Sequence, residues 1–353
     1  MKKYLRLTNL ILIVLLIFTA CKKDNVDPDG TTPTKQDSLP KYVQTANVYV
    51  AGSTYDSVTY KREAAYWKNG VAVILTRDNR YASANAIAVD GDNVYATGYT
   101  TDANGATIAT YWKNGIQVNL TQNNTNASAG SIAIQGNDVY IAGFVGSSAV
   151  FWKNGQQFNL PLLGGMTIGS SAGIALQGTD IYVSGYQIGP KASAVYWKNG
   201  EPFRLPNDSA SYAGKNIAFE DGNMYIPASY QGNTKGARVN YWKNNVPVSL
   251  TDLAFSVNAI QILINGADVY LACHTSKGSG YLKNNQLTLL SANAVSPEIT
   301  GLGLIGDDVY CSGQSTYQKL SVATFWKNNI PVYLSSPIGR GGFASSIVVK
   351  PLK

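Results

Sequence analysis

Residues 86–120 read AIAVDGDNVYATGYTTDANGATIATYWKNGIQVNL, and the fold can be predicted from them. Four short segments in it show the apolar alternation that is typical of β-strands; they are residues 86–89, 94–98, 109–112 and 116–120. Asn114-Gly115, between the last two segments, is a strong signal for a tight hairpin. The stretch therefore predicts four short antiparallel strands, which we name strands A, B, C and D in chain order.

The same unit recurs seven times along the chain, at intervals of 40 to 45 residues. Trp-Lys-Asn-Gly, or a variant of it, marks the end of strand C at Trp67, Trp112, Trp152, Trp197, Trp242, Leu282 and Trp326. An apolar residue followed by Tyr marks strand B at Tyr49, Tyr95, Tyr140, Tyr182, Tyr225, Tyr270 and Tyr310. Strand A carries Ile-Ala-aliphatic or a related triplet, beginning at Ile87, Ile132, Ile174, Ile217, Ile262, Leu302 and Ile347. Repeats of this length with four antiparallel strands are typical of β-propeller blades.

The two ends of the repeat array indicate a closed ring. The first copy begins at strand B, residues 47–52, and the chain ends in a lone strand A, residues 346–349. Pairing these two strands in one blade removes two exposed sheet edges. We therefore predict an all-β, seven-bladed β-propeller over residues 41–353, with the C-terminal strand joining the N-terminal blade. This region resembles bacterial propellers built of short Gly-x-x-Val-Tyr-x-x-Gly repeats, and it lacks the Trp-Asp dipeptide of WD40 repeats and the paired glycines of kelch repeats.

The N-terminus is predicted to be a secretory signal peptide over residues 1–20, because cations precede an apolar run, residues 10–18, that ends in small residues. That run is too short for a membrane span, which needs roughly 20 residues. The small residues directly before Cys21 resemble the lipobox of bacterial lipoproteins, although Phe18 stands where Leu is usual. The resemblance implies that Cys21 is lipidated and anchors the protein to a membrane.

By the same resemblance, Lys22 after the cysteine implies the outer membrane of a Gram-negative bacterium. Which side of that membrane the protein faces, periplasm or cell surface, stays open. Residues 21–40 hold three prolines and many small polar residues without apolar periodicity. They are predicted to form a disordered tether between the anchor and the propeller.

The composition excludes several classes of function. The 353 residues are 45% hydrophobic but only 14% charged, against about 25% in an average soluble domain. A single histidine, His274, and three cysteines exclude zinc sites built from several His or Cys ligands. We expect no metal, no cofactor, no nucleic-acid partner and a monomer. Cys273 lies three residues, and Cys311 one residue, after the strand B Tyr of its own blade. Because both offsets are odd, the two side chains point the same way around the ring and do not face each other. We therefore expect two buried free thiols.

We prefer structural roles over ligand binding for the repeated residues. The Trp residues are predicted to pack between blades, although seven equivalent ligand sites are the alternative. The repeated lysines of the strand C–D hairpins lie on one rim together with Asp92, Asp138, Asp180, Asp268 and Asp308, which precede strand B. Both the lysines and the aspartates can be explained as polar residues of solvent-exposed turns, and a shared metal or nucleic-acid function is the alternative.

The opposite rim carries connections that differ from blade to blade, so we expect ligand binding there. We call it the irregular rim. Tyr and Arg side chains on exposed loops are well suited to ligand recognition. The candidate binding residues are Tyr55, Arg62, Arg80, Tyr99, Tyr186, Tyr230, His274 and Arg340.

Two functions remain open at this stage. The preferred one is a non-catalytic binding or scaffold module for a glycan, a peptide or an envelope protein, with no catalytic residue. The alternative is a glycan lyase or hydrolase with its site at the axial mouth of the irregular rim. Two carboxylates, or His274 with Tyr and Arg, converging at that mouth would indicate an enzyme.

Overall fold

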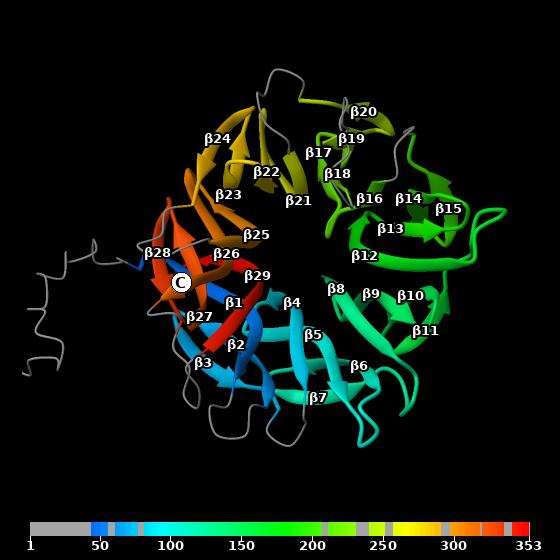
Figure 1. Cartoon of the computed structure of the whole chain (residues 1–353), viewed down its shortest axis with the longest axis horizontal. Coiled ribbons are helices and arrows are strands. Elements are labelled where there is room, and N and C mark those ends of the chain that lie inside the picture. The colour runs from blue at the N-terminus through cyan, green and yellow to red at the C-terminus, as the bar shows by residue number, and fades with distance from the viewer. Residues whose placement is uncertain are drawn as a thin grey trace, which may run out of the picture. The chain divides into compact units, whose positions relative to one another are not determined.

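The protein is a seven-bladed β-propeller, as the repeats predict (Figure 1). A computed structural model describes residues 44–55, 61–76, 81–206, 211–230, 240–250, 257–290, 297–317, 320–334 and 341–352. Every regular element in these ranges is a β-strand. Within them there is accordingly no helix that is long and apolar enough to cross a membrane.

Each blade is an antiparallel sheet with strand A nearest the axis and strand D at the outside (Figure 1). Blade 1 consists of β29 (Gly341–Pro351), β1 (Ala46–Tyr55), β2 (Arg62–Lys68) and β3 (Val71–Ile74). Blade 2 consists of β4 (Ala82–Asp90), β5 (Asn93–Thr101), β6 (Thr107–Lys113) and β7 (Ile116–Asn119). Blade 3 consists of β8 (Ala127–Gln135), β9 (Asp138–Val145), β10 (Ser148–Lys153) and β11 (Gln156–Asn159). Blades 4 and 5 consist of β12 (Ile168–Gln177), β13 (Asp180–Ile188), β14 (Ala192–Lys198), β15 (Glu201–Arg204); β16 (Ser211–Ala213), β17 (Ala218–Glu220), β18 (Asn223–Tyr230), β19 (Tyr241–Lys243) and β20 (Val246–Val248). Blades 6 and 7 consist of β21 (Val257–Asn265), β22 (Asp268–Thr275), β23 (Gly278–Lys283), β24 (Gln286–Leu289); β25 (Glu298–Ile305), β26 (Asp308–Tyr317), β27 (Leu320–Lys327) and β28 (Ile330–Tyr333).

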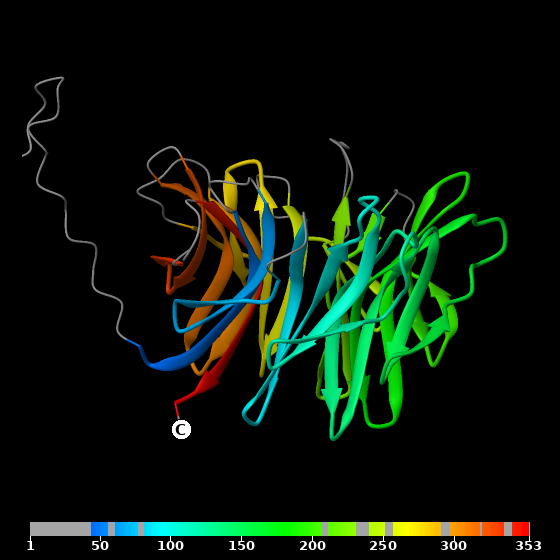
Figure 2. The same ribbon diagram turned by 90° about the horizontal axis from the view of Figure 1, so that it is seen from below.

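The ring is closed by the C-terminal strand, β29, which pairs antiparallel with β1 from Tyr55↔Gly341 to Ala46↔Pro351. Figure 2 shows this strand, in red, beside the blue β1. The pairing confirms the blade assembled from both ends of the chain. An unpaired β1 would present a free edge to other chains.

The inner strands are longer than the apolar alternation predicts. Strand A of blade 2 spans Ala82–Asp90 rather than residues 86–89, and strand B spans Asn93–Thr101 rather than residues 94–98. The additional residues lie toward the irregular rim and are mostly small or hydroxyl-bearing. Because they carry little apolar periodicity, the sequence pattern stops before the backbone pairing does.

A β-bulge interrupts strand A of six blades at the same place, for example between Ala84 and Ala86. Opposite the bulge, strand B carries Gly98, where a Cβ would lie 1.8 Å from the carbonyl oxygen of Ser83. This close approach explains the second glycine of the Gly-x-x-Val-Tyr-x-x-Gly pattern. Repeats alone did not predict the bulge.

The six Trp side chains are buried, with exposed fractions of 0 to 1%. Each core cluster combines neighbouring blades: Trp197 of blade 4, for example, packs with Tyr140 and Ala142 of blade 3. The packing interpretation of the Trp residues is thereby confirmed, because rings that are sealed between blades are not presented to a ligand.

The two cysteines of the propeller, Cys273 and Cys311, are buried free thiols, as predicted. Burial raises the pKa of Cys273 to about 12 and raises that of Cys311 as well. Both thiols therefore stay protonated at neutral pH and are poor nucleophiles.

Candidate axial ligand-binding site

A cavity of about 490 Å³ lies at the axial mouth of the irregular rim, and we call it the axial pocket. Its walls come from blades 4, 5, 6, 7 and 1, near the ends of strands A and B. The lining residues with polar, charged or aromatic side chains are Tyr186, Tyr212, Lys215, Ser229, Asn258, His274, Glu298, Thr300 and Phe343. The volume lies in the range of small-molecule sites.

The pocket forms where one position of strand A departs from its repeat. One residue ahead of the last pair before the bulge, blades 2, 3 and 4 carry serine, at Ser83, Ser128 and Ser170. The next four blades carry Tyr212, Asn258, Glu298 and Phe343 at this position. All four line the pocket. The seven-fold ring is therefore chemically asymmetric around its axis.

Strand B compensates for this change in size. Where strand A has serine, the residue paired with it is a large ring, as in Ser170↔Tyr186. In blades 5 and 1 the order is reversed, since Tyr212 pairs with Ser229 and Phe343 pairs with Ser53. Each of these pairs thus combines one large and one small side chain.

Blade 5 adds a cation to the pocket. Three residues, Gly214, Lys215 and Asn216, separate Ala213 from Ile217, whereas two residues separate the equivalent Ala84 and Ile87 of blade 2. Strand A is split here into β16 and β17. The insertion places Lys215 in the lining of the pocket.

Lys215 is held through its backbone. Its N–H donates to the carbonyl oxygen of Ile260 in blade 6 at 2.9 Å. The side chain of Asn216 bonds both the N–H and the carbonyl oxygen of Ile262, at 3.0 and 2.6 Å. The Lys215 side chain is accessible to solvent but enclosed by the ring, so desolvation lowers its pKa.

His274 lies among charged neighbours. Desolvation lowers the pKa of His274; the Glu298 carboxylate opposes this shift, and the Lys215 ammonium adds to it. The imidazole is therefore neutral at pH 7, because its ordinary pKa of 6.5 is already below that pH. Its Nδ1 forms a 2.8 Å hydrogen bond with the hydroxyl of Ser279.

The remaining walls are oriented by neighbours. The Gln314 amide donates to Oε2 of Glu298 at 2.6 Å. The rings of Tyr186 and Tyr212 meet edge to face, with centroids 4.5 Å apart at 78°. Desolvation and the nearby Tyr186 raise the pKa of Tyr212, so the Tyr212 phenol stays a neutral hydrogen-bonding group.

Two of the residues predicted from sequence, Tyr186 and His274, line the pocket. Tyr55 and Arg62 lie beside it: the Arg62 guanidinium is 5.8 Å from the ring centroids of both Tyr55 and Phe343. Tyr99 pairs with Ser83 in blade 2 and is not a lining residue. The backbone of Tyr230 pairs in β18, while its side chain and all of Cys21, Arg80 and Arg340 lie outside the described residues.

The candidate residues predicted from the sequence do not include Lys215, Asn258, Glu298 or Phe343. The available signals were the change from serine before the bulge and the one-residue insertion in blade 5. Among the described lining residues, Glu298 is the one carboxylate, and a lysine rather than an arginine accompanies His274 and the tyrosines. Among the described lining residues, neither arrangement that we set as the mark of an enzyme is complete.

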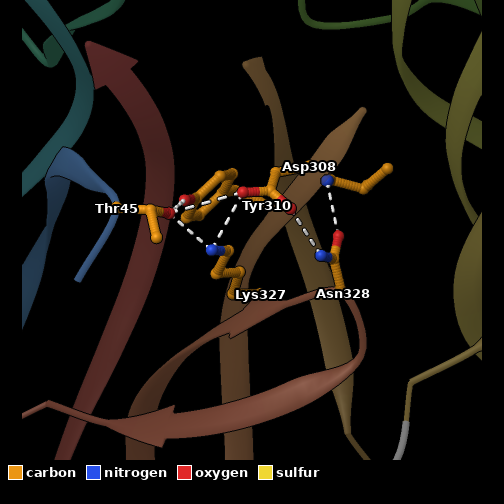
Figure 3. Close-up of polar contacts among 6 residues, drawn as sticks. Thr45, Asp308, Tyr310, Lys327 and Asn328 are labelled. Carbon is orange, nitrogen blue, oxygen red and sulfur yellow. Dashed lines mark hydrogen bonds and ion pairs between the residues drawn. The ribbon is translucent and has the colours of Figure 1, made fainter. Parts of the chain in front are cut away.

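The opposite rim carries repeated polar clusters of Asp, Lys, Asn and Tyr. In blades 3, 4, 6 and 7 a lysine lies 2.8 to 3.0 Å from an aspartate; the pairs are Lys153–Asp138, Lys198–Asp180, Lys283–Asp268 and Lys327–Asp308. In each of these four blades, the asparagine that follows the lysine donates a hydrogen bond to the same aspartate. It also accepts a hydrogen bond from the backbone N–H of the residue after that aspartate. Figure 3 shows blade 7, where Thr45 also joins the cluster.

These clusters brace the two hairpins of a blade against each other. Asp92 was wrongly grouped with them, because its neighbour Asn93 occupies the position of the aspartates and accepts a hydrogen bond from Asn114. In the part of the chain that is described, no group of three or more His, Cys, Asp or Glu residues is suited to hold a metal ion. The hydrogen bonds and ion pairs of these clusters are those expected where two turns are braced against each other.

The clusters predict a loss of stability in acid. Hydrogen bonds from lysine and asparagine lower the pKa of Asp180, Asp268 and Asp308, and those from Asn154 and Lys153 lower that of Asp138, in each case from 3.8. Because the folded pKa is the lower one, this stabilisation is complete above about pH 4 and is lost as the pH falls through the folded pKa values. We expect Tm to fall as the pH drops below about 4 and through the folded pKa values.

A matched variant isolates this contribution. Asn47, Asn93 and Asn223 occupy the aspartate position in blades 1, 2 and 5, so the quadruple Asp→Asn variant of the other four blades is compatible with the fold. Its Tm should fall less over the same pH interval. An equal fall in the variant and the natural chain would contradict the assignment.

No protein-family model matches the sequence, and neither does any curated protein. Among solved structures, a puromycin-hydrolysing peptidase from Mycobacterium tuberculosis is 11% identical, with a TM-score of 0.56 over 86% of this chain and 54% of that one. TolB from Acinetobacter baumannii is 9% identical, with a TM-score of 0.45 over 90% and 69%. An acylaminoacyl peptidase from Pyrococcus horikoshii is 13% identical, with a TM-score of 0.48 over 83% and 51%. The chain spans about half the length of the two peptidases.

At 11% identity the likeness to the Mycobacterium tuberculosis peptidase shows the fold alone, and it agrees with the ring of blades described above. Fold and pocket together define a class: a β-propeller with one asymmetric, polar and aromatic pocket at its axis.

Proposed function

We propose that the protein is a lipid-anchored binding module of the bacterial cell envelope that takes a glycan unit in its axial pocket. The observation that carries this proposal is the pocket itself, which combines the Tyr186–Tyr212 aromatic pair with the Asn258 amide and the Glu298 carboxylate. Aromatic faces suit the apolar faces of sugar rings, and amide and carboxylate groups suit their hydroxyls. A concave site of this volume fits a ligand unit better than a flat protein surface.

A glycan array with the full chain in detergent micelles tests this proposal. Tyr186→Ala should weaken binding of a retained glycan about tenfold or more, because it removes half of the aromatic pair. Tyr99→Ala is the matched control, since Tyr99 holds the equivalent position opposite a serine in blade 2, outside the pocket. Binding of no glycan, or equal loss in both variants, would contradict the proposal.

A second candidate function, a glycan lyase or hydrolase, is favoured by one observation. His274 is neutral at pH 7 and lies in the pocket with Lys215 and two tyrosines, so it can accept a proton there. Product formation from a bound glycan that is abolished by His274→Gln, with binding retained, would establish this activity in place of simple binding.

Membrane anchorage rests on the sequence around Cys21, which lies outside the described residues. Acylation stabilises membrane attachment by about 0.8 kcal/mol for each buried methylene group, so several chains give durable binding. Cys21→Ser is therefore expected to move the protein from the outer-membrane fraction to the soluble fraction. Unchanged fractionation of this variant would refute the anchor without affecting the pocket.

A further inference from the structure

We propose that the axial pocket recognises a carboxylate, that of an acidic sugar, and that the Lys215 ammonium is its anchor. This inference rests on the proposed glycan-binding function and specifies its ligand class. It starts from the charge of Lys215, which the surrounding protein leaves uncompensated.

Four lysines of the described residues form ion pairs, and all four lie in the hairpin clusters of the opposite rim. The ammonium of Lys215 has no ion-pair or hydrogen-bond partner among the described residues. It nevertheless lies in the enclosed mouth of the ring, where desolvation disfavours the charged form. A ligand anion would supply the missing partner, and a charge-assisted hydrogen bond in such a site is stronger than one in water.

The placement of Lys215 is built into the backbone. The inserted residue, its N–H bond to Ile260 and the Asn216 clamp on Ile262 hold the segment against blade 6. Gly214 allows this approach, because a Cβ there would lie 2.7 Å from the carbonyl oxygen of Ile260. A cation fixed by its own main chain loses less entropy on binding than one on a free loop.

The acidic group of the pocket does not neutralise Lys215. The Glu298 carboxylate accepts a hydrogen bond from the Gln314 amide at 2.6 Å, and its charge acts to raise the pKa of His274. Desolvation by the surrounding ring lowers the pKa of Lys215, and no neighbouring charge contributes to the shift. The lysine charge is therefore available to a ligand.

The other groups select the kind of anion. Lys215 is the one lysine of the described lining, and His274 is neutral at pH 7, which suits a singly charged carboxylate better than a phosphate. The Tyr186–Tyr212 pair and the Asn258 amide suit a ring with hydroxyl groups. A carboxylate-bearing sugar satisfies both requirements.

Calorimetric titration of the full chain tests this inference with oligosaccharides that end in glucuronate, galacturonate or sialate, each beside its methyl ester. We expect an acid to bind and its ester to bind roughly 10- to 100-fold more weakly. Lys215→Gln should weaken binding of the acid by a similar factor and leave the ester unchanged. Lys191→Gln, an exposed lysine of the same rim outside the pocket, should change neither.

The other outcomes separate the two proposals. Equal binding of acids and esters, or an unchanged affinity in Lys215→Gln, would overturn the carboxylate inference and leave glycan binding intact. Binding of a tripeptide with a free C-terminus but of no sugar would overturn the sugar class. Binding of neither sugars nor the peptide would overturn this inference together with the proposed function. Circular dichroism of each variant shows whether the fold is retained.

Discussion

A chain truncated after residue 340 is expected to lose cooperative folding. The deletion removes β29, so β1 loses its inner partner, and the faces of β25, β26 and β27 that pack against β29 become exposed. Buried Ala344 and Ile347 leave the core between blades 7 and 1. A ring whose blades contact only their neighbours cannot redistribute such a loss. We expect aggregation, or a broad thermal transition in circular dichroism.

A second truncation provides the control. Removing only residues 352 and 353 leaves β29 complete, and Leu352 is 50% exposed. This shorter truncation should keep the Tm of the natural chain. A cooperative transition at an unchanged Tm in the longer truncation would show that the ring does not depend on its C-terminal strand.

Trp152→Ala is expected to lower the free energy of unfolding by about 3–5 kcal/mol, the usual effect of deleting a buried Trp side chain. Trp152 is fully buried and packs with Ala109 of blade 2 and with Ile141 and Val150 of its own blade. Its Nε1 has no hydrogen-bond partner, so the loss comes from apolar packing. Denaturant unfolding followed by circular dichroism measures the change.

Ile116→Ala is the control for this variant, because Ile116 is 71% exposed and its truncation should change stability little. A loss below about 1 kcal/mol for Trp152→Ala, together with weakened glycan binding, would restore the alternative in which the repeated Trp residues bind ligands.

The fold could be predicted from the sequence because each blade repeats the same hydrophobic alternation and the same turn residues. Asn114-Gly115, for example, adopts positive φ at both residues, 52° and 82°, as the tight hairpin requires. Tyr49 in the first copy and Ile347 in the last further implied that one blade joins both ends of the chain. The strand limits and the bulges were not predictable, because they depend on main-chain contacts between strands rather than on apolar periodicity.

The candidate site was predicted only in part. Tyr186 and His274 were found because they stand on the irregular rim, which unequal loop lengths identify. Lys215 and Phe343 were not, because repeats draw attention to what recurs, whereas the pocket consists of the positions that depart from the repeat. Comparing Tyr212, Asn258 and Glu298 with the serines of blades 2 to 4 would have found it.

The seven blades, the closing strand and the buried Trp core could be predicted from the sequence, since hydrophobic periodicity and turn residues act locally and repeat. Which rim residues meet at the axis depends on the folded ring. Lys215 of blade 5 and Phe343 near the end of the chain line one pocket. Ring closure makes distant strands neighbours, and a bulge or a single inserted residue changes where a side chain points. Neither effect is visible within a single repeat, and the insertion appears only when the blades are compared with one another.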